Sequence, residues 1–315
     1  MRGSVIVVGR VSVDLYAREA GASFRDPQTF NKSVGGSPTN VAVAAARLGH
    51  DVVLLTKVGS DELGEYVIGR LNEFGVDTSR VGISEGERTP VVIASMDPPE
   101  DPRVIFHRKL DAPDTTLQVD ALSKTDIEQC DVLWITGGTL ARGTTASACT
   151  HWLDSRQRRP HTVFDIDFRP SFWDSQDDAQ HAAVAAIKQS TVVVGNRSEC
   201  AMALGTDEPN RAADEMLELG VAIAVVKMGG DGVLLANQRE RVTIAPLRVP
   251  VVCGLGSGDA FGGALVHGLL SNWDLRTIGE YANAAGAYVA ARLSCADSMP
   301  DLRELTEFVT TSGRG

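Results

Sequence analysis

The chain has 315 residues, 43% of them hydrophobic and 23% charged, which is enough for the core of one large domain. Its formal net charge of −11 argues against nucleic acid as a partner, because binding phosphates requires a basic surface. No apolar stretch reaches the roughly 20 residues that span a bilayer, and the five cysteines show no C-x-x-C pairing. We therefore expect a cytoplasmic protein that interacts with neither nucleic acid nor membrane.

Short strands and helices are predicted in the first quarter of the chain. Residues 4–8 form a continuous apolar run, as expected of a buried parallel strand, whereas residues 11–16 alternate polar and apolar side chains. A segment rich in small residues, 41–49, indicates a helix that can pack close to a sheet. The predicted elements are strands at 4–8, 11–16, 29–34 and 52–56 and helices at 41–49 and 61–74.

A hairpin is predicted next, and it interrupts the alternation of strands and helices. Its strands, 89–96 and 103–109, flank a proline-rich connection. Together with strands 11–16 and 29–34 they could form a small separate sheet. We interpret this sheet as a lid over the main domain, with its strands at about 10–35 and 88–110.

From residue 131 onward, strands alternate regularly with helical segments. Repeated strand–helix units imply a parallel sheet with helices on both faces, and ligands collect where the strands of such sheets end. Glycine or polar clusters directly follow four of these strands, at 137–138, 165–169, 196–199 and 229–230. The predicted elements are strands at 132–136, 162–165, 191–194 and 222–227, a hairpin at 233–236 and 241–244, and helices at 260–270, 275–293 and 302–310.

The stretch 254–263, G-L-G-S-G-D-A-F-G-G, precedes the apolar helix 260–270. Free N–H groups at a helix N-terminus attract phosphate, and Asp259 lies in the first turn. An anion site beside a carboxylate suits phosphoryl transfer to a hydroxyl, because the carboxylate can accept the proton of the attacking oxygen. The same pattern is also typical of a packing turn in which Asp259 is a capping residue.

Three motifs together resemble the ribokinase-like (PfkB) sugar kinase family. They are G-G-S-P-T-N at 35–40, the N-x-x-E element at 196–199, and G-S-G-D at 256–259, in the family's order. The resemblance covers essentially the whole chain. It implies an α/β fold, a ribokinase-like parallel-sheet sandwich with helices on both faces and a small β-sheet lid, as a single kinase domain over residues 1–315.

The resemblance also implies roles for individual residues. Asp259 would be the general base, and the amides of Gly256, Ser257 and Gly258 would form the anion hole. Asn196 and Glu199 would organise Mg²⁺ around the triphosphate of ATP, Glu199 through water, although both residues are equally suited to helix capping. The residues expected to border the nucleotide are Lys227, Gly229, Gly232 and Asn283, the last of which could instead have only a local structural partner. The residues expected to contact sugar hydroxyls are Asp14, Gly35, Gly36 and Asn40.

Two arginines bear on the identity of the sugar. Arg108 ends the lid strand, and Arg169 lies in D-I-D-F-R-P-S-F-W at 165–173. Arginine binds carboxylates bidentately, so both are candidates for binding a sugar acid, with a solvated lid position or a tie between loops as the structural alternatives. The 165–173 stretch resembles that of 2-keto-3-deoxygluconate kinases and still more that of 5-dehydro-2-deoxygluconokinases.

The resemblance therefore implies ATP- and Mg²⁺-dependent phosphorylation of the terminal hydroxyl of a keto-deoxy sugar acid, first of all 5-dehydro-2-deoxy-D-gluconate. The alternatives are a 2-keto-3-deoxygluconate kinase, a fructokinase and, in another class, a non-catalytic sugar-binding sensor. Cys253 and Gly254 stand where the family usually has Asp-Thr, so the sequence does not support a monovalent-cation site, although backbone carbonyls could still bind one. The resemblance is also compatible with a homodimer formed through the lid.

Overall fold

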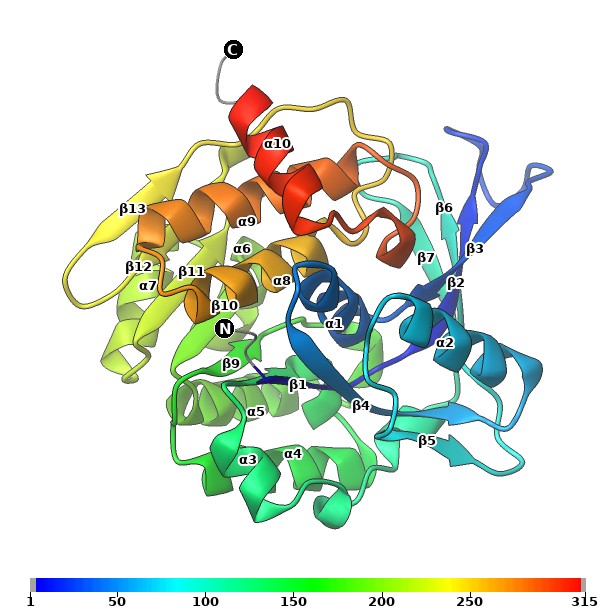
Figure 1. The fold of residues 1–315 in the computed structure, drawn as a ribbon, viewed down its shortest axis with the longest axis horizontal. Coiled ribbons are helices and arrows are strands. Elements are labelled where there is room, and N and C mark those ends of the chain that lie inside the picture. Colours follow the sequence, from blue (N-terminus) through cyan, green and yellow to red (C-terminus); the bar gives the residue numbers. More distant parts are fainter. Residues whose placement is uncertain (1–3, 313–315) are drawn as a thin grey trace.

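A sheet of nine strands runs through the centre of this computed structural model, which describes residues 4–312 (Figure 1). The first three and last three residues of the predicted domain lie outside that range. The strand order is β13-β12-β11-β10-β9-β8-β1-β4-β5. The strands are β1 (Ser4–Val8), β4 (Asp51–Gly59), β5 (Val81–Ser84), β8 (Val132–Thr136), β9 (Thr162–Asp165), β10 (Val192–Asn196), β11 (Ile223–Lys227), β12 (Val233–Ala236) and β13 (Arg241–Ile244).

Most of this sheet is parallel, as the sequence predicts. β1 pairs in parallel with both β4 and β8, and only the hairpin of β12 and β13 adds antiparallel strands at one edge. Valine-rich strands of this kind can be buried on both faces because most of their side chains are apolar. The strand missed from the sequence is β5, whose four residues V-G-I-S form no apolar run and pair with β4 at the opposite edge.

Helices cover both faces of the sheet and form two separate hydrophobic cores (Figure 1). One face is covered by α1 (Ser37–Arg47), α2 (Glu62–Glu73), α8 (Ser257–Leu270), α9 (Leu275–Ala290) and α10 (Leu302–Ser312). The other face is covered by α3 (Lys124–Gln129), α4 (Gly143–Arg156), α5 (Gln176–Gln189), α6 (Arg197–Leu204) and α7 (Pro209–Glu218). The helix predicted at 41–49 begins four residues earlier, because Pro38 fits its first turn.

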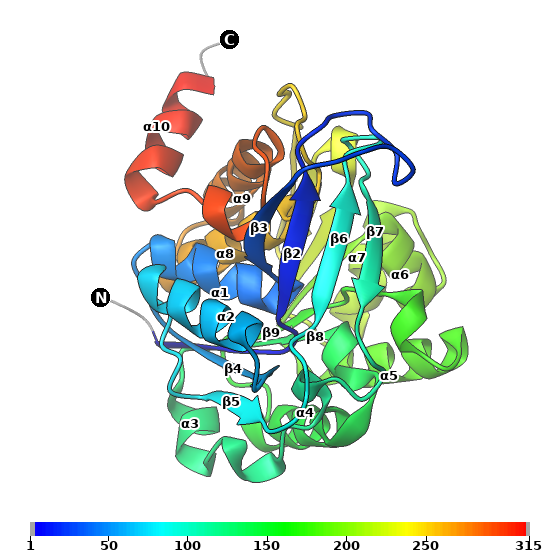
Figure 2. The same cartoon turned by 90° about the vertical axis from the view of Figure 1, so that its right-hand side faces the viewer.

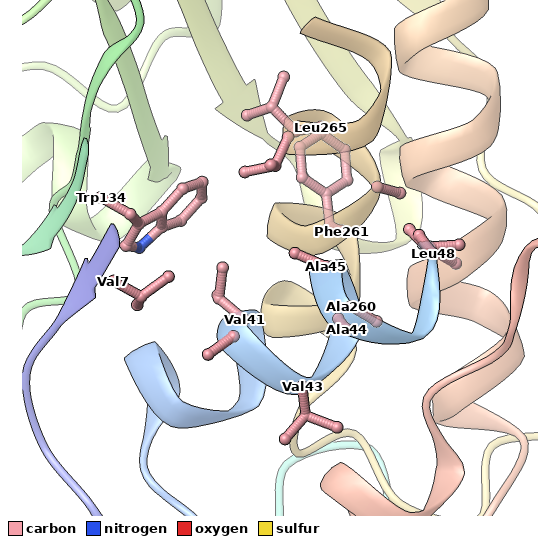
Figure 3. Close-up of a cluster of buried hydrophobic side chains, with 14 of the residues drawn as sticks. Val7, Val41, Val43, Ala44, Ala45, Leu48, Trp134, Ala260, Phe261 and Leu265 are labelled. Carbon is pink, nitrogen blue, oxygen red and sulfur yellow. The ribbon is translucent and has the colours of Figure 1, made fainter. Parts of the chain in front are cut away.

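Helices α1 and α8 pack closely against each other (Figure 3). A Cβ atom added to Gly263 would lie 2.3 Å from the Cβ of Ala44, so the contact depends on glycine. Trp134, Val41 and Phe261 surround this contact in the core. The close approach brings together the first turns of two helices that are far apart in the sequence.

The predicted lid is a separate four-stranded sheet in the order β3-β2-β6-β7 (Figure 2). It consists of β2 (Ser12–Ala17), β3 (Phe30–Gly35), β6 (Val91–Ser95) and β7 (Arg103–His107). β2 pairs antiparallel with β3 and parallel with β6, and β6 and β7 form the predicted hairpin. Only three residues separate β1 from β2, so the small sheet begins next to the C-terminal end of β1. Within residues 4–312, no helix has the length and apolar character needed to cross a membrane.

Candidate active site

The first turn of α8 forms one wall of the candidate site. Its N-cap, Gly256, has a φ of 80°, and an added Cβ would lie 2.5 Å from the Sγ of Cys295, so the position favours glycine on both counts. The hydroxyl of Ser257 donates to the carbonyl oxygen of Gly254 at 2.8 Å and is therefore directed back toward the turn. The first-turn amides have no acceptor within the helix, so they are free to bind an anion.

Asp259 is the carboxylate at this helix start. The Nδ2 atom of Asn40 donates to its Oδ2 atom at 2.8 Å, which joins the first turns of α1 and α8. Burial raises the pKa of Asp259 above its usual value, against the opposing effect of hydrogen bonds from Asn40 and Ser37. A carboxylate with a raised pKa and a fixed orientation is suited to accept a proton from a hydroxyl.

Asp14 is a second buried carboxyl group, on lid strand β2. Its Oδ1 accepts from the hydroxyl of Ser12 at 2.6 Å, and its Oδ2 accepts from the hydroxyl of Tyr16 at 3.0 Å. Burial raises the pKa of Asp14 to about 6, and the charge of Asp259 adds to the rise. A Cβ on Gly35 would lie 2.0 Å from the carboxyl carbon of Asp14, so glycine is required beside it.

Lys227, the last residue of β11, lies among carboxylates at the ends of the central strands. Its Nζ is 3.9 Å from Oδ1 of Asp165, and a Cβ on Gly258 would lie only 3.4 Å from that Nζ. Burial favours the neutral amine, but Asp165, Glu199 and Asp259 outweigh it and raise the pKa of Lys227 to about 12. A permanently charged ammonium group thus stands beside the first turn of α8.

Asp165 ends β9 and faces this ammonium group. Burial raises the pKa of Asp165 to about 7, although Lys227 lowers it. Its Oδ1 is buried and accepts no hydrogen bond from the residues that the structure describes. The sequence placed Asp165 in a strand-end cluster but assigned it no role, because only the fold shows that Lys227 faces it.

Asn196 and Glu199 form a capping box at the start of α6. Oδ1 of Asn196 accepts from the amide of Glu199 at 2.9 Å, and Oε2 of Glu199 accepts from the amide of Asn196 at 2.7 Å. The structural alternative raised from the sequence therefore describes real contacts. Carboxylate oxygens are the ligands that Mg²⁺ prefers, so Glu199 and Asp165 together also fit a hydrated Mg²⁺ ion.

The other positions expected near a nucleotide lie around β11 to β13 and α9. Gly229 and Gly232 both have positive φ angles, 60° and 94°, and a Cβ on Gly232 would lie 2.0 Å from the carbonyl oxygen of Ile244. Nδ2 of Asn283 donates to the carbonyl oxygen of Ala245 at 2.9 Å, which is the local partner that the sequence left open. These contacts give each residue a structural role beside any role in binding.

The two arginines predicted from the sequence differ in how much of their charge is neutralised. Arg108 donates from both terminal nitrogens to Asp114, at 2.6 and 3.2 Å. The side chain of Arg169 is 45% exposed, and its Nη2 lies 3.1 Å from Oδ1 of Asp167. Asp167 raises the pKa of Arg169 further, so this cation stays charged. Arg169 is therefore the better placed of the two to bind an anion from solution.

Arg10 is a third arginine at the site, and the sequence analysis missed it. It lies between β1 and β2, and its Nη2 donates to Oδ2 of Asp167 at 2.7 Å. One signal in the sequence could have identified it. Arg10 follows the first strand by two residues, and ligands bind at the edge where the strands of such sheets end.

A cavity of about 130 Å³ opens beside Arg108. Its lining includes Arg108, Gly138, Phe106 and Phe172. The guanidinium carbon of Arg10 is 4.9 Å from the centre of the Phe172 ring, and that of Arg108 is 5.0 Å from it. One aromatic ring therefore contacts two cations at the margin of the site.

Comparisons with known proteins give one consistent result. The family model described as "pfkB family carbohydrate kinase" matches residues 2–302. Two similar proteins are 5-dehydro-2-deoxygluconokinases: that of Clostridium botulinum is 29% identical, with 97% of this chain and 92% of the relative covered, and that of Geobacillus kaustophilus is 30% identical, with 98% and 94% covered. The crystal structure of a proposed ribokinase II from E. coli in complex with ATP and Mg²⁺ superposes with a TM-score of 0.88, at 23% identity, over 99% of this chain and all of that one.

The whole-length family match, the named kinase relatives and the shared fold have one explanation. The chain is a phosphotransferase that acts on a carbohydrate, and it belongs to the pfkB family of carbohydrate kinases.

Proposed function

We propose that this kinase transfers the terminal phosphoryl group of ATP to the terminal hydroxyl of a keto-deoxy sugar acid, with 5-dehydro-2-deoxy-D-gluconate as its substrate. Two relatives that match 97% and 98% of the chain are named 5-dehydro-2-deoxygluconokinase. The observation that carries the choice of an acid is Arg169, a half-exposed cation paired with Asp167 in an otherwise acidic protein. A neutral sugar would leave this charge without a partner on the ligand.

Asp259 accepts the proton of the attacking hydroxyl in this proposal. A hydrogen bond from Asn40 to one carboxylate oxygen fixes the orientation of this side chain. The raised pKa of Asp259 makes its carboxylate a stronger base than an ordinary one. Asp14 accepts hydrogen bonds from sugar hydroxyls, and Gly35 and Gly36 let the sugar approach the backbone.

The migrating negative charge is stabilised by groups already fixed in the structure. The amides of the first turn of α8 bind the transferred phosphoryl group, and the ammonium group of Lys227 stands beside them. Glu199 and Asp165 would hold Mg²⁺ through its water molecules, and this ion would neutralise charge on the phosphate oxygens. In this proposal Gly229, Gly232 and Asn283 border the nucleotide, which is the role that the family resemblance implies.

The test is release of ADP by the purified protein with each of four acceptors: 5-dehydro-2-deoxygluconate, 2-keto-3-deoxygluconate, fructose and ribose. We expect the highest kcat/KM with the first. A preference for fructose or ribose would overturn the proposed substrate, and no ADP release with any acceptor would favour a non-catalytic sensor.

The role of Asp259 is tested by the variant Asp259→Asn. Turnover should fall roughly 10²- to 10⁴-fold, the usual contribution of a general base, with the Kd for ATP preserved. Near-normal turnover would rule out the assignment.

A further inference from the structure

Arg10 has an unsatisfied hydrogen-bonding group in the middle of the site. Its side chain is only 9% exposed, and its Nη2 pairs with Asp167. Its Nη1 is buried and has no hydrogen-bond partner among residues 4–312. Leaving a buried charged donor unpaired is costly, so such a group calls for an explanation at a binding site.

Arg10 and Arg169 share one carboxylate. Asp167 accepts from Arg10 at its Oδ2 and pairs with Arg169 at its Oδ1. Three further carboxylates act on Arg169 less strongly than Asp167, namely Glu199, Asp259 and Asp165. The open position for a ligand is therefore the unpaired Nη1 donor of Arg10 rather than a surplus of positive charge.

We propose that the carboxylate of the sugar acid binds to Arg10 and Arg169, with Nη1 of Arg10 as one of its donors. The inference rests on the proposed function, and it names the residue that distinguishes an acid from a neutral sugar. Asp167 contacts both guanidinium groups, and these contacts fix the spacing between them before the substrate binds. Arginine suits this position better than lysine, because its planar fork can bond Asp167 and a ligand at once.

The surroundings of Arg10 fix the plane of its guanidinium group. A Cβ on Gly138 would lie 2.0 Å from Nη1, so this nitrogen rests directly on the glycine backbone. Phe172 covers the guanidinium group and contacts Phe106 on lid strand β7, with ring centres 5.4 Å apart.

The alternative is a purely structural role, in which Arg10 only braces Asp167. Asp167 has a φ of 30°, an unusual conformation for a residue other than glycine, and a brace would help to hold it. If Arg10 is only a brace, replacing it should change the kinetics with all substrates and also the stability of the fold. If Arg10 binds the substrate carboxylate, replacing it should raise KM for sugar acids alone.

The experiment compares Arg10→Met and Arg10→Lys with the wild type in steady-state kinetics on 5-dehydro-2-deoxygluconate and on fructose. The matched control is Arg47→Met. Arg47 is the last residue of α1 and pairs with Glu304 of α10. We expect KM for the acid to rise roughly 10- to 100-fold in Arg10→Met, the usual effect of losing a charge-assisted hydrogen bond. KM for ATP and kcat/KM for fructose should stay within about two-fold, and Arg10→Lys should recover part of the loss.

A second measurement is independent of turnover and of the methionine variant. Gluconate and glucitol are polyols of equal length, with and without a carboxylate, and serve as competitive inhibitors of the wild type and Arg10→Lys. We expect gluconate to inhibit the wild type more strongly, and this preference to shrink in Arg10→Lys. An unchanged KM for the acid or an unchanged gluconate preference would overturn the role of Arg10. A wild type that phosphorylates no sugar acid would instead overturn the proposed function.

Discussion

Replacing Asp14 with asparagine should stabilise the protein while weakening sugar binding. The fold raises the pKa of Asp14 from 3.8 to about 6, because the carboxyl group is buried. This rise corresponds to about 3 kcal/mol by which the folded state disfavours the ionised carboxylate at neutral pH. An amide carries no charge, so Asp14→Asn removes this cost.

The expected gain is smaller than the full cost. Asp14 accepts from both Ser12 and Tyr16, and an amide keeps only one acceptor oxygen, so we subtract about 1 kcal/mol for a lost hydrogen bond. The remaining gain of about 2 kcal/mol corresponds to a rise in Tm of about 3 °C, from a typical unfolding entropy of about 2.1 cal/mol/K per residue over 315 residues.

The sign of this effect depends on pH. A carboxyl group whose pKa is raised by folding destabilises the protein above the folded pKa, and the cost is lost as the pH falls from 6 toward 3.8. Unfolding of the wild type and Asp14→Asn should therefore be followed at pH 7.5 and pH 4, and the variant's advantage should appear only at pH 7.5. KM for the sugar should rise at least about 10-fold, because the amide accepts fewer hydrogen bonds from hydroxyls. A variant less stable than the wild type at pH 7.5 would refute the reasoning.

Three further substitutions test the site. Asn40→Ala removes a hydrogen bond that lowers the pKa of Asp259, so the acidic limb of the pH profile of kcat should move to higher pH. If the limb does not move, Asn40 does not influence the pKa of the group that limits kcat at low pH. Gly35→Ala would place a Cβ 2.0 Å from the Asp14 carboxyl carbon, so KM for the sugar should rise while KM for ATP does not, and a normal sugar KM would contradict that crowding. Gly256→Ala would clash with a cysteine side chain at a φ of 80°, so kcat should fall at least about 10-fold, and full turnover would show that the anion hole tolerates the change.

The elements that the sequence predicts well are those with a strong local pattern. β1 and β8 are largely apolar runs, and the alternation in β2 also predicts a strand. The alternation wrongly indicates a half-exposed strand, because Ser12, Asp14 and Tyr16 of β2 are all buried. β5 has no such pattern, because an exposed four-residue edge strand depends on its pairing with β4 rather than on its own side chains. Local sequence patterns thus predict strands whose own side chains are mostly apolar.

Contacts between distant residues could not be predicted in this way. Asn40 and Asp259 were both expected at the site, but the hydrogen bond between them joins residues 219 apart. Arg10 contacts Asp167 across 157 positions, and an arginine after a strand has no local sign of a buried partner. The sequence motifs name residues that meet at the site, whereas the charge balance among them depends on the fold.

The contact of Ala44 with Gly263 has a consequence for how mutations in this protein should be classified. Neither residue has a side chain that could adjust, so any enlargement at either position must push α1 and α8 apart. The displaced helices carry Asn40 and Asp259, so an apolar substitution in the core would shift the proposed base without touching the substrate. A core variant that folds well but turns over slowly would therefore report on the distance between two helix starts. In this kinase, interior packing sets the spacing between the two helix starts that carry Asn40 and Asp259.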